Sequence, residues 1–139
     1  MAISFDNALG NQVAGLQLRV KRSQLISNNM ANAETPGYRA VDFDFAKVYD
    51  RTRAMPSNAA VAAAKNGHFS VEPGGADGLI KPGDVDFRDN KLGSLDGNKV
   101  SLEQERARFM ENQIRMNATN MFLSKRFSSL QKALRGVNG

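Results

Sequence analysis

The side chains that could carry out chemistry are few and scattered along this 139-residue chain. His68 is its single histidine and no cysteine is present, so neither a Cys–His pair nor a thiolate metal site can form. Because no serine with a neighbouring base accompanies His68, we expect it to be a surface residue without a catalytic partner. The sequence therefore predicts a protein that is not an enzyme and that holds no cofactor.

Two groups of aspartates resemble metal sites only superficially. Asp42 and Asp44 are two residues apart, but no third oxygen ligand is placed to complete a coordination shell, and a solvated strand face is favoured. Asp84, Asp86 and Asp89 lack the glycine and the terminal glutamate of a calcium loop. We therefore expect no metal site in this chain.

Composition places the chain among soluble proteins of one domain's length, with 41% hydrophobic and 24% charged residues. Seven of its 12 glycines lie between Gly67 and Gly97, so a single compact globule is not expected. Residues 1–6 lack the basic and apolar regions of a secretory signal peptide. No run of about 18 apolar residues is present either, so we expect no membrane insertion by the chain itself.

The formal charge of +5 is concentrated at the two ends. Residues 1–30 carry three bases against one acid, and residues 101–139 carry seven bases against three acids, whereas the middle has nine bases and ten acids. Such an excess raises the possibility of nucleic-acid binding. Because no contiguous basic stripe or exposed aromatic pair accompanies it, solvated faces of amphipathic helices are favoured and no nucleic-acid partner is expected.

The N-terminal segment has the pattern of a long amphipathic helix from Phe5 to about Ala33. Apolar or small residues recur there at alternating steps of four and three, which is a heptad pattern. Its members are Leu9, Val13, Leu16, Val20, Ser23, Ser27 and Met30. Leu18, Leu25 and Ile26 widen this seam on one side, so the helix has more than one apolar stripe.

This helix is expected to stop within the stretch 25–38. Asparagine amides at Asn29 and Asn32 can bond nearby backbone and compete with the helix. Pro36 disfavours the α region for Thr35, and Gly37 permits a positive φ, so the chain must leave the helix axis in a tight turn. Tyr38 then follows, and we expect its side chain to hold the turn in place.

The middle of the chain shows weaker patterns. Val41–Phe45 alternates apolar and acidic residues, which predicts an extended segment. Ala46–Arg53 and Asn58–Ala64 favour short helical turns. His68–Glu72 and Lys91–Leu95 are strand-like pieces separated by Pro-Gly turns, which indicates a flexible or hairpin-like insert.

A second long helix is predicted from Ser101 onward. Ser101 and Gln104 form a capping box, acids occupy the first turns, and bases gather near the end. The apolar members of its heptad seam are Leu102, Phe109, Met116, Leu123, Phe127, Leu130, Leu134 and Val137, and Met110, Ile114 and Met121 form a second stripe beside it. We expect a mainly α protein in which long terminal amphipathic helices pack as a coiled-coil-like pair around an extended, β-containing, Gly/Pro-rich middle. Its three parts are residues 1–38, 39–100 and 101–139.

The stretch Asn29-Met30-Ala31-Asn32-Ala33-Glu34-Thr35-Pro36-Gly37-Tyr38 resembles the N-terminal signature of the bacterial flagellar rod and hook family. The run Asp96-Gly97-Asn98-Lys99-Val100-Ser101 and the following helix resemble that family's C-terminal element. The likeness covers both ends, roughly half of the chain, in the structural context the motif requires. Short length and direct entry into Val41–Phe45 point to a proximal rod subunit of the B type, with the similarly sized C type as the alternative.

The resemblance implies a structural subunit of the periplasmic rod of the flagellar basal body. It also implies export through the flagellar type III apparatus without a cleaved signal peptide, and contacts with other copies and neighbouring rod proteins. Two helices with several apolar stripes cannot cover all of them within one chain, so the assembly interface is predicted at Leu9, Val13, Leu16, Val20, Phe109, Met116, Leu123, Phe127, Leu130 and Leu134. A cytoplasmic coiled-coil adaptor would explain the heptads but not the Pro-Gly stop.

Overall fold

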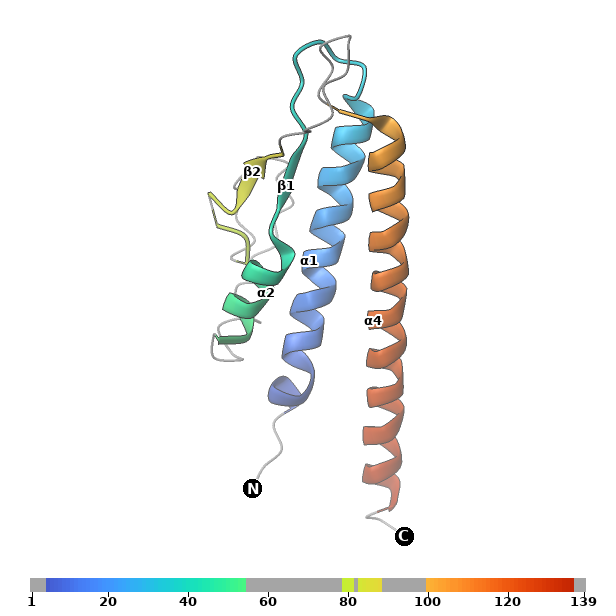
Figure 1. The fold of residues 1–139 in the computed structure, drawn as a ribbon. Helices are drawn as coiled ribbons and strands as arrows, with labels where there is room; N and C mark the ends of the chain where they lie inside the picture. Colours follow the sequence, from blue (N-terminus) through green and yellow to red (C-terminus); the bar gives the residue numbers. More distant parts are fainter. Residues whose placement is uncertain (1–4, 55–78, 82, 89–99, 137–139) are drawn as a thin grey trace.

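The computed structural model describes residues 5–54, 79–81, 83–88 and 100–136. Within these ranges lie helix α1 (Phe5–Ala31), strand β1 (Val41–Phe43), helix α2 (Phe45–Ala54), strand β2 (Val85–Phe87) and helix α4 (Leu102–Gly136). Figure 1 shows α1 and α4 running side by side, with the start of α1 and the end of α4 toward the same end of the molecule. The prediction of a mainly α fold with two long terminal helices is confirmed.

Helices α1 and α4 pack as an antiparallel pair. Asn112 on α4 donates a hydrogen bond from Nδ2 to the carbonyl of Arg19 over 2.8 Å. One residue on, Gln113 Nε2 donates to Ser23 Oγ over 3.3 Å. Nearer the start of α4, Glu105 accepts a hydrogen bond from Asn29 of α1, so residue numbers fall along α1 from Asn29 to Arg19 as they rise along α4 from Glu105 to Asn112. The two helices therefore run in opposite directions. These bonds place polar side chains inside the helix pair, where they fix its register.

Helix α4 begins where the capping box predicts. The backbone N–H of Gln104 donates to Ser101 Oγ at 3.5 Å, and the N–H of Glu105 donates to the Ser101 carbonyl at 3.0 Å. Ser101 therefore satisfies one N–H at the start of the helix. Glu103 and Glu105 in the first turn also suit the positive end of the helix dipole.

The most buried stripe of α1 is not the heptad seam. Ala14, Leu18 and Ile26 are at most 3% exposed, whereas the seam residues Val13 and Val20 are 37% and 42% exposed. Leu18 of this stripe packs against Phe43 of β1 and Val48 of α2, and both elements lie on the side of α1 away from α4 (Figure 1). The core of the molecule therefore uses the stripe that the sequence presents only as a widening of the seam.

The hydrophobic core joins four segments of the chain. Leu18 from α1, Phe43 from β1, Val48 from α2 and Leu79 form one buried cluster. Because each of these segments contributes one large side chain, α2 and the segment at 79–88 are held to α1 mainly by burial of apolar surface. The core thus lies on one side of α1, and no described helix or strand packs on the side of α4 that faces away from α1.

Strands β1 and β2 form a two-stranded antiparallel sheet. The register pairs Val41 with Phe87, Asp42 with Asp86 and Phe43 with Val85, so two identical Val-Asp-Phe tripeptides pair with each other. The N–H of Arg88 donates to the Ala40 carbonyl over 2.8 Å and extends the pairing. The sequence analysis did not predict β2, which is only three residues long.

Other predictions for the middle have mixed outcomes. The extended segment ends at Phe43, earlier than predicted, because Asp44 accepts a hydrogen bond from the N–H of Lys47 at 3.1 Å and starts α2. The helical turns predicted at 46–53 are confirmed as part of α2. The pieces predicted at 58–64, 68–72 and 91–95 lie outside the described residues.

Candidate assembly surface and the turn that positions it

The turn after α1 forms as the sequence predicts. Asn32 donates from its side-chain amide and from its backbone N–H to the Asn28 carbonyl, over 2.9 and 3.1 Å. Gly37 has a φ of +76°, and the N–H of Tyr38 donates back to the Thr35 carbonyl over 3.2 Å. A residue with a side chain rarely adopts this φ, which explains the glycine. The exposed Pro36 and Gly37 form the tip of the turn.

Asn29 has a different role from the one predicted. Its side chain is fully buried and reaches across to β1, where Oδ1 accepts from the Val41 N–H at 3.0 Å and Nδ2 donates to the Val41 carbonyl at 2.8 Å. The same Oδ1 accepts from the Tyr38 hydroxyl at 3.0 Å, and Nδ2 also donates to Glu105 at 3.2 Å. Asn29 therefore joins α1, the turn, β1 and α4 instead of competing with the backbone of its own helix.

Glu105 on α4 is the buried charge at the centre of this junction. It is 1% exposed and forms an ion pair with Arg88, which follows β2. Arg108 approaches the same carboxylate at 3.9 Å from the next turn of α4. A buried carboxylate is tolerated only when opposite charge and hydrogen bonds replace its water, and Asn29 and Arg88 supply both.

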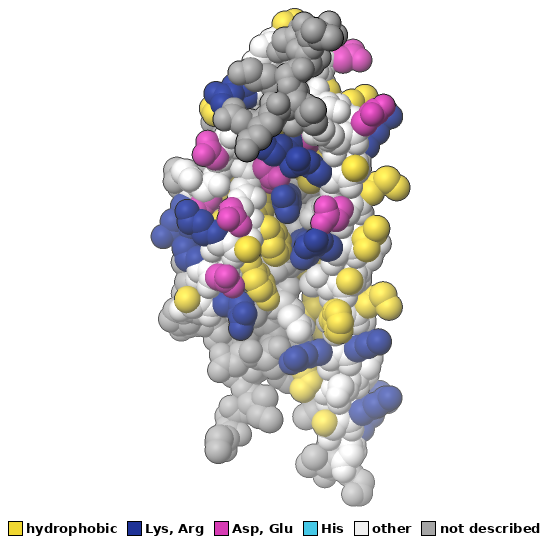
Figure 2. Space-filling view, viewed as in Figure 1, with side chains coloured by type: hydrophobic (Ala, Val, Ile, Leu, Met, Phe, Trp, Pro, Cys, Tyr) yellow, Lys and Arg dark blue, Asp and Glu magenta, His cyan; other side chains and the backbone are white. Residues whose placement is uncertain are grey.

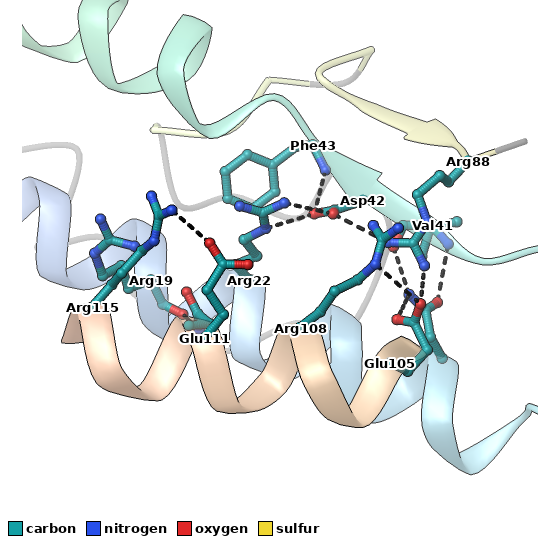
Figure 3. A network of polar contacts seen from close by, with 12 residues as sticks. Arg19, Arg22, Val41, Asp42, Phe43, Arg88, Glu105, Arg108, Glu111 and Arg115 are labelled. Atoms are coloured by element: carbon teal, nitrogen blue, oxygen red, sulfur yellow. Dashed lines mark hydrogen bonds and ion pairs between the residues drawn. The ribbon is translucent and has the colours of Figure 1, made fainter. Parts of the chain in front are cut away.

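Asp42 extends the network along β1 (Figure 3). Arg22 on α1 binds it with two hydrogen bonds, from Nε at 3.0 Å and from Nη2 at 2.8 Å. Arg88 reaches the same carboxylate at 3.4 Å. Because Arg88 contacts both Asp42 and Glu105, the residue after β2 connects the strand pair to α4.

Tyr38 anchors the turn as predicted. Its ring packs against a small buried cluster of Ala33, Ala40 and Val100, and its hydroxyl donates to Asn29. Burial, and secondarily the negative charge of Glu105, raise the pKa of the Tyr38 phenol. The hydroxyl therefore keeps its proton and remains a donor at neutral pH.

The predicted interface residues fall into three groups. Leu123 is buried and Leu16, Phe109, Met116 and Leu130 are half-buried. Val13, Val20 and Phe127 are exposed, Phe127 to 53%. The side chains of Leu9 and Leu134 lie outside the described residues. Part of the seam thus contributes to the packing of this chain, and part is left open.

Among the described residues, the most exposed large apolar side chains lie on or beside the second stripe of α4. Met110, Ile114 and Met121 are 67%, 69% and 63% exposed, and the neighbouring Phe122 is 64% exposed. Figure 2 shows apolar side chains along the outer edge of α4, with basic side chains toward its C-terminal end. The sequence pattern identified this stripe but did not predict that it would be more exposed than the heptad seam. It also did not include Phe122.

The aspartates considered as metal ligands have other partners. Asp84 binds Arg51 of α2 through two hydrogen bonds, of 2.8 and 2.5 Å, and Asp42 binds Arg22 and Arg88. Asp89 lies outside the described residues. Among the helices that the structure describes, none is long and apolar enough to cross a membrane.

Comparison with known proteins gives full-length relatives. No family model matches the chain. It is 34% identical over 138 residues to the flagellar basal body rod protein FlgB of Aeromonas hydrophila, covering 98% of each chain. It is 33% identical over 143 residues to FlgB of Escherichia coli K12, covering 99% of this chain and all of that one. FlgB of Cereibacter sphaeroides is 35% identical over 132 residues, covering 95% of this chain and 97% of its own.

These relatives match along almost the whole chain, including the middle that the motif resemblance did not cover. They confirm the B type over the C type. The buried junction built from Asn29 and Tyr38 of the motif, and the paired terminal helices, are therefore features of a chain that belongs to the FlgB family of flagellar basal body rod proteins.

Proposed function

We propose that this chain is a structural subunit of the proximal rod, and that it self-assembles through its terminal helices into the helical drive shaft that crosses the periplasm. The observation that carries the proposal is the set of apolar side chains left open on both helices after they have packed together. Val13 and Val20 on α1 and Phe127 on α4 are each more than a third exposed. Exposed apolar residues on several sides of one molecule favour contacts with more than one neighbour.

Contacts on different sides of a subunit lead to an open helical array when they do not close on themselves. We assign the self-contacts to the predicted seam, consisting of Leu9, Val13, Leu16, Val20, Phe109, Met116, Leu123, Phe127, Leu130 and Leu134. The buried and half-buried members of this set stabilise the subunit and hold the exposed members in position. The role is structural, and the name of the relatives, flagellar basal body rod protein, supports it.

The same proposal covers location and partners. The subunit reaches the periplasmic rod through the type III export apparatus without a cleaved signal peptide, and there contacts other copies and neighbouring rod and basal body proteins. The relatives' name, flagellar basal body rod protein, supports a place in the basal body.

Replacing Phe127 with Asp tests the proposal, because this residue is more exposed than its half-buried neighbour Leu130. A charge at a dry contact between subunits is strongly unfavourable. We expect the variant to be produced and exported, but to be missing from purified basal bodies, so that cells lack motility. Ser124→Asp, one turn earlier at an exposed polar position, is the matched control and should leave motility intact.

The thermal unfolding midpoint of each purified variant separates assembly from folding. A Phe127→Asp subunit that folds normally and still enters the rod would overturn the proposal. Loss of the folded monomer would instead place Phe127 in the core of the subunit, which also contradicts the proposed role.

A further inference from the structure

The C-terminal half of α4 carries basic residues and no acidic ones. From Gln113 to Gly136 the helix contains Arg115, Lys125, Arg126, Lys132 and Arg135 and no acidic residue, and all five bases are exposed. Arg115 pairs with Glu111 of the preceding turn at 2.5 Å. In the part of the chain that the structure describes, the other four bases form no ion pair. Their positive charge is therefore available to a partner.

The open apolar stripe and three of these bases, Lys125, Lys132 and Arg135, share the same side of the helix. At about 100° per residue, Met110, Ile114 and Met121 fall within an arc of about 40°. This arc lies about 160 to 180° from Glu105, Asn112 and Leu123, the buried residues of α4. The stripe thus faces almost directly away from α1.

Three of the bases continue the stripe, whereas the other two lie about 120 to 140° from its centre, beside Phe122. Lys125, Lys132 and Arg135 lie within about 40° of its centre, on the turns that follow Met121. Arg115 and Arg126 lie within about 40° of the exposed Phe122. The described strands and α2 all lie beyond α1 from this side of α4 (Figure 1). The result is one surface, apolar in its first half and basic in its second, which we call the open face of α4.

We propose that the open face of α4 binds an acidic amphipathic helix of a different protein. This inference rests on the proposed rod function and deepens it by naming the chemistry of one partner. The partner helix carries apolar residues at heptad spacing, which pack on Met110, Ile114 and Met121, and it carries carboxylates beside Lys125 and Lys132.

A second copy of this chain does not fit the open face through its terminal helices. Helix α1 carries three bases against one acid, and α4 carries seven against three. Either helix of another copy would bring positive charge against the basic half of the face, and like charges across an interface are unfavourable. Self-contacts therefore use the seam on the other sides of the helices, and the open face is left for an acidic protein.

The narrowness of the stripe favours a helix over a membrane surface. Helices that lie in a bilayer interface bury a broad apolar face, whereas an apolar arc of about 40° is typical of a coiled-coil seam. Lys125 and Lys132 also lie within about 40° of the centre of the stripe. A lipid layer that took up the apolar residues would therefore have to take up these two charges as well. Binding to anionic lipid is an outcome that the experiment below can detect.

Photo-cross-linking in flagellated cells tests the proposal with the full chain. A benzophenone amino acid replaces Met121, and mass spectrometry identifies the cross-linked peptide. We expect a segment of another basal body protein with heptad-spaced apolar residues and a net negative charge. A product with a second copy of this chain, a lipid adduct, a basic partner segment, or no protein adduct overturns the inference.

Reversing the charge of two lysines on the open face gives a quantitative test, with the cross-link yield as the measurement. The double variant Lys125→Glu, Lys132→Glu should reduce the cross-link yield at least about tenfold, since two attractive pairs become repulsive. Lys125→Arg, Lys132→Arg retains the charge and should keep the yield within about twofold of the parent. Equal yields from the Glu and Arg variants would contradict the assignment.

The outcomes distinguish this inference from the rod function itself. A cross-link to a second copy, obtained from purified basal bodies, leaves the proposed self-assembly standing while the acidic partner is rejected. Absence of the unsubstituted chain from purified basal bodies rejects the rod function, whatever the open face binds.

Discussion

Asn29 uses the full hydrogen-bonding capacity of its side chain in a fully buried position. Two donated and two accepted bonds connect it to Val41, Tyr38 and Glu105, and these three residues come from three different segments. No other side chain of similar size offers two donors and two acceptors in this geometry. The residue therefore specifies how the turn, β1 and α4 meet, and this explains why an asparagine occupies this position in α1.

Replacing Asn29 with Ala should destabilise the chain by about 2 to 4 kcal/mol, because the Val41 amide and the Tyr38 hydroxyl lose their partners inside the protein. Urea unfolding at neutral pH measures the change. Asn32→Ala is the matched control. That amide donates to the carbonyl one turn earlier and accepts a 3.5 Å hydrogen bond from the exposed Thr35 hydroxyl, at a half-exposed position, so a loss of about 1 kcal/mol or less is expected. Equal effects of the two substitutions would show that the junction contributes little.

Asp84 and Arg51 form the second polar contact that holds the middle of the chain in place. The two hydrogen bonds from Arg51, together with the Lys81 N–H at 2.6 Å, lower the pKa of the Asp84 carboxyl from 3.8 to about 2. Arg51 also donates to the Leu79 carbonyl at 2.7 Å. One guanidinium therefore binds the end of α2 to the chain that leads into β2.

The lowered pKa of Asp84 predicts a pH dependence of stability. A carboxyl with a depressed pKa in the folded state stabilises the fold above its unfolded pKa, and this contribution is lost as the pH falls from about 4 to about 2. The full contribution is about 2 kcal/mol. We expect Asp84→Asn to lower the free energy of unfolding by roughly that amount at pH 7 and to leave it nearly unchanged at pH 2. A loss of the same size at both pH values would exclude the ion pair as its origin.

At the scale of elements, the turn between α1 and β1 depends on the backbone of Gly37. A Cβ built at this position meets no atom within 4 Å, so the cost of a substitution comes from the φ of +76° alone. We expect Gly37→Val to cost about 1 to 3 kcal/mol and to impair rod assembly more than expression. Gly37→Asn is the control, because asparagine tolerates the left-handed region best among residues with side chains. Normal motility and stability in the Val variant would show that the turn is not strained.

The elements that sequence reasoning recovered are those specified by local signals. The capping box at Ser101, the Pro-Gly turn and the heptad periods each act within a few residues, and the structure contains the helices and the turn that they predict. Strand β2 was missed because a three-residue strand carries almost no periodic signal. Its one indication was the identity of the tripeptides at 41–43 and 85–87, which pair in the sheet.

The roles of individual side chains were harder to predict, because they depend on long-range packing. Asn29 and Glu105 are 76 residues apart in the sequence, and no spacing rule connects them. The heptad seam of α1 likewise does not reveal that β1 and α2 pack on a different stripe of the helix, the one that contains Leu18. Which of several apolar stripes becomes the core depends on what packs against it.

At the scale of the whole molecule, the contacts of α4 are concentrated at its N-terminal end. Glu105 and Asn112 are buried there among bonds to α1 and Arg88, whereas beyond Leu123 the helix has no buried residue among those described, and only Leu130 is half-buried. The far part of α4 instead carries exposed bases and Phe127. One end of the helix is thus fixed to the subunit, and the other is available for contacts between proteins.

This asymmetry predicts a gradient of hydrogen exchange along α4 in the isolated subunit. Local opening requires least free energy where buried contacts are fewest. Amides between Glu105 and Met116 should therefore exchange slowly, and those beyond Leu123 should exchange at least about tenfold faster, as should the first turns of α1. In assembled basal bodies the difference should shrink, since neighbouring subunits would cover Phe127 and Leu130. Uniformly strong protection through Leu130 in the monomer would mean that the chain stabilises this end of α4 by itself, and that assembly is not needed to order it.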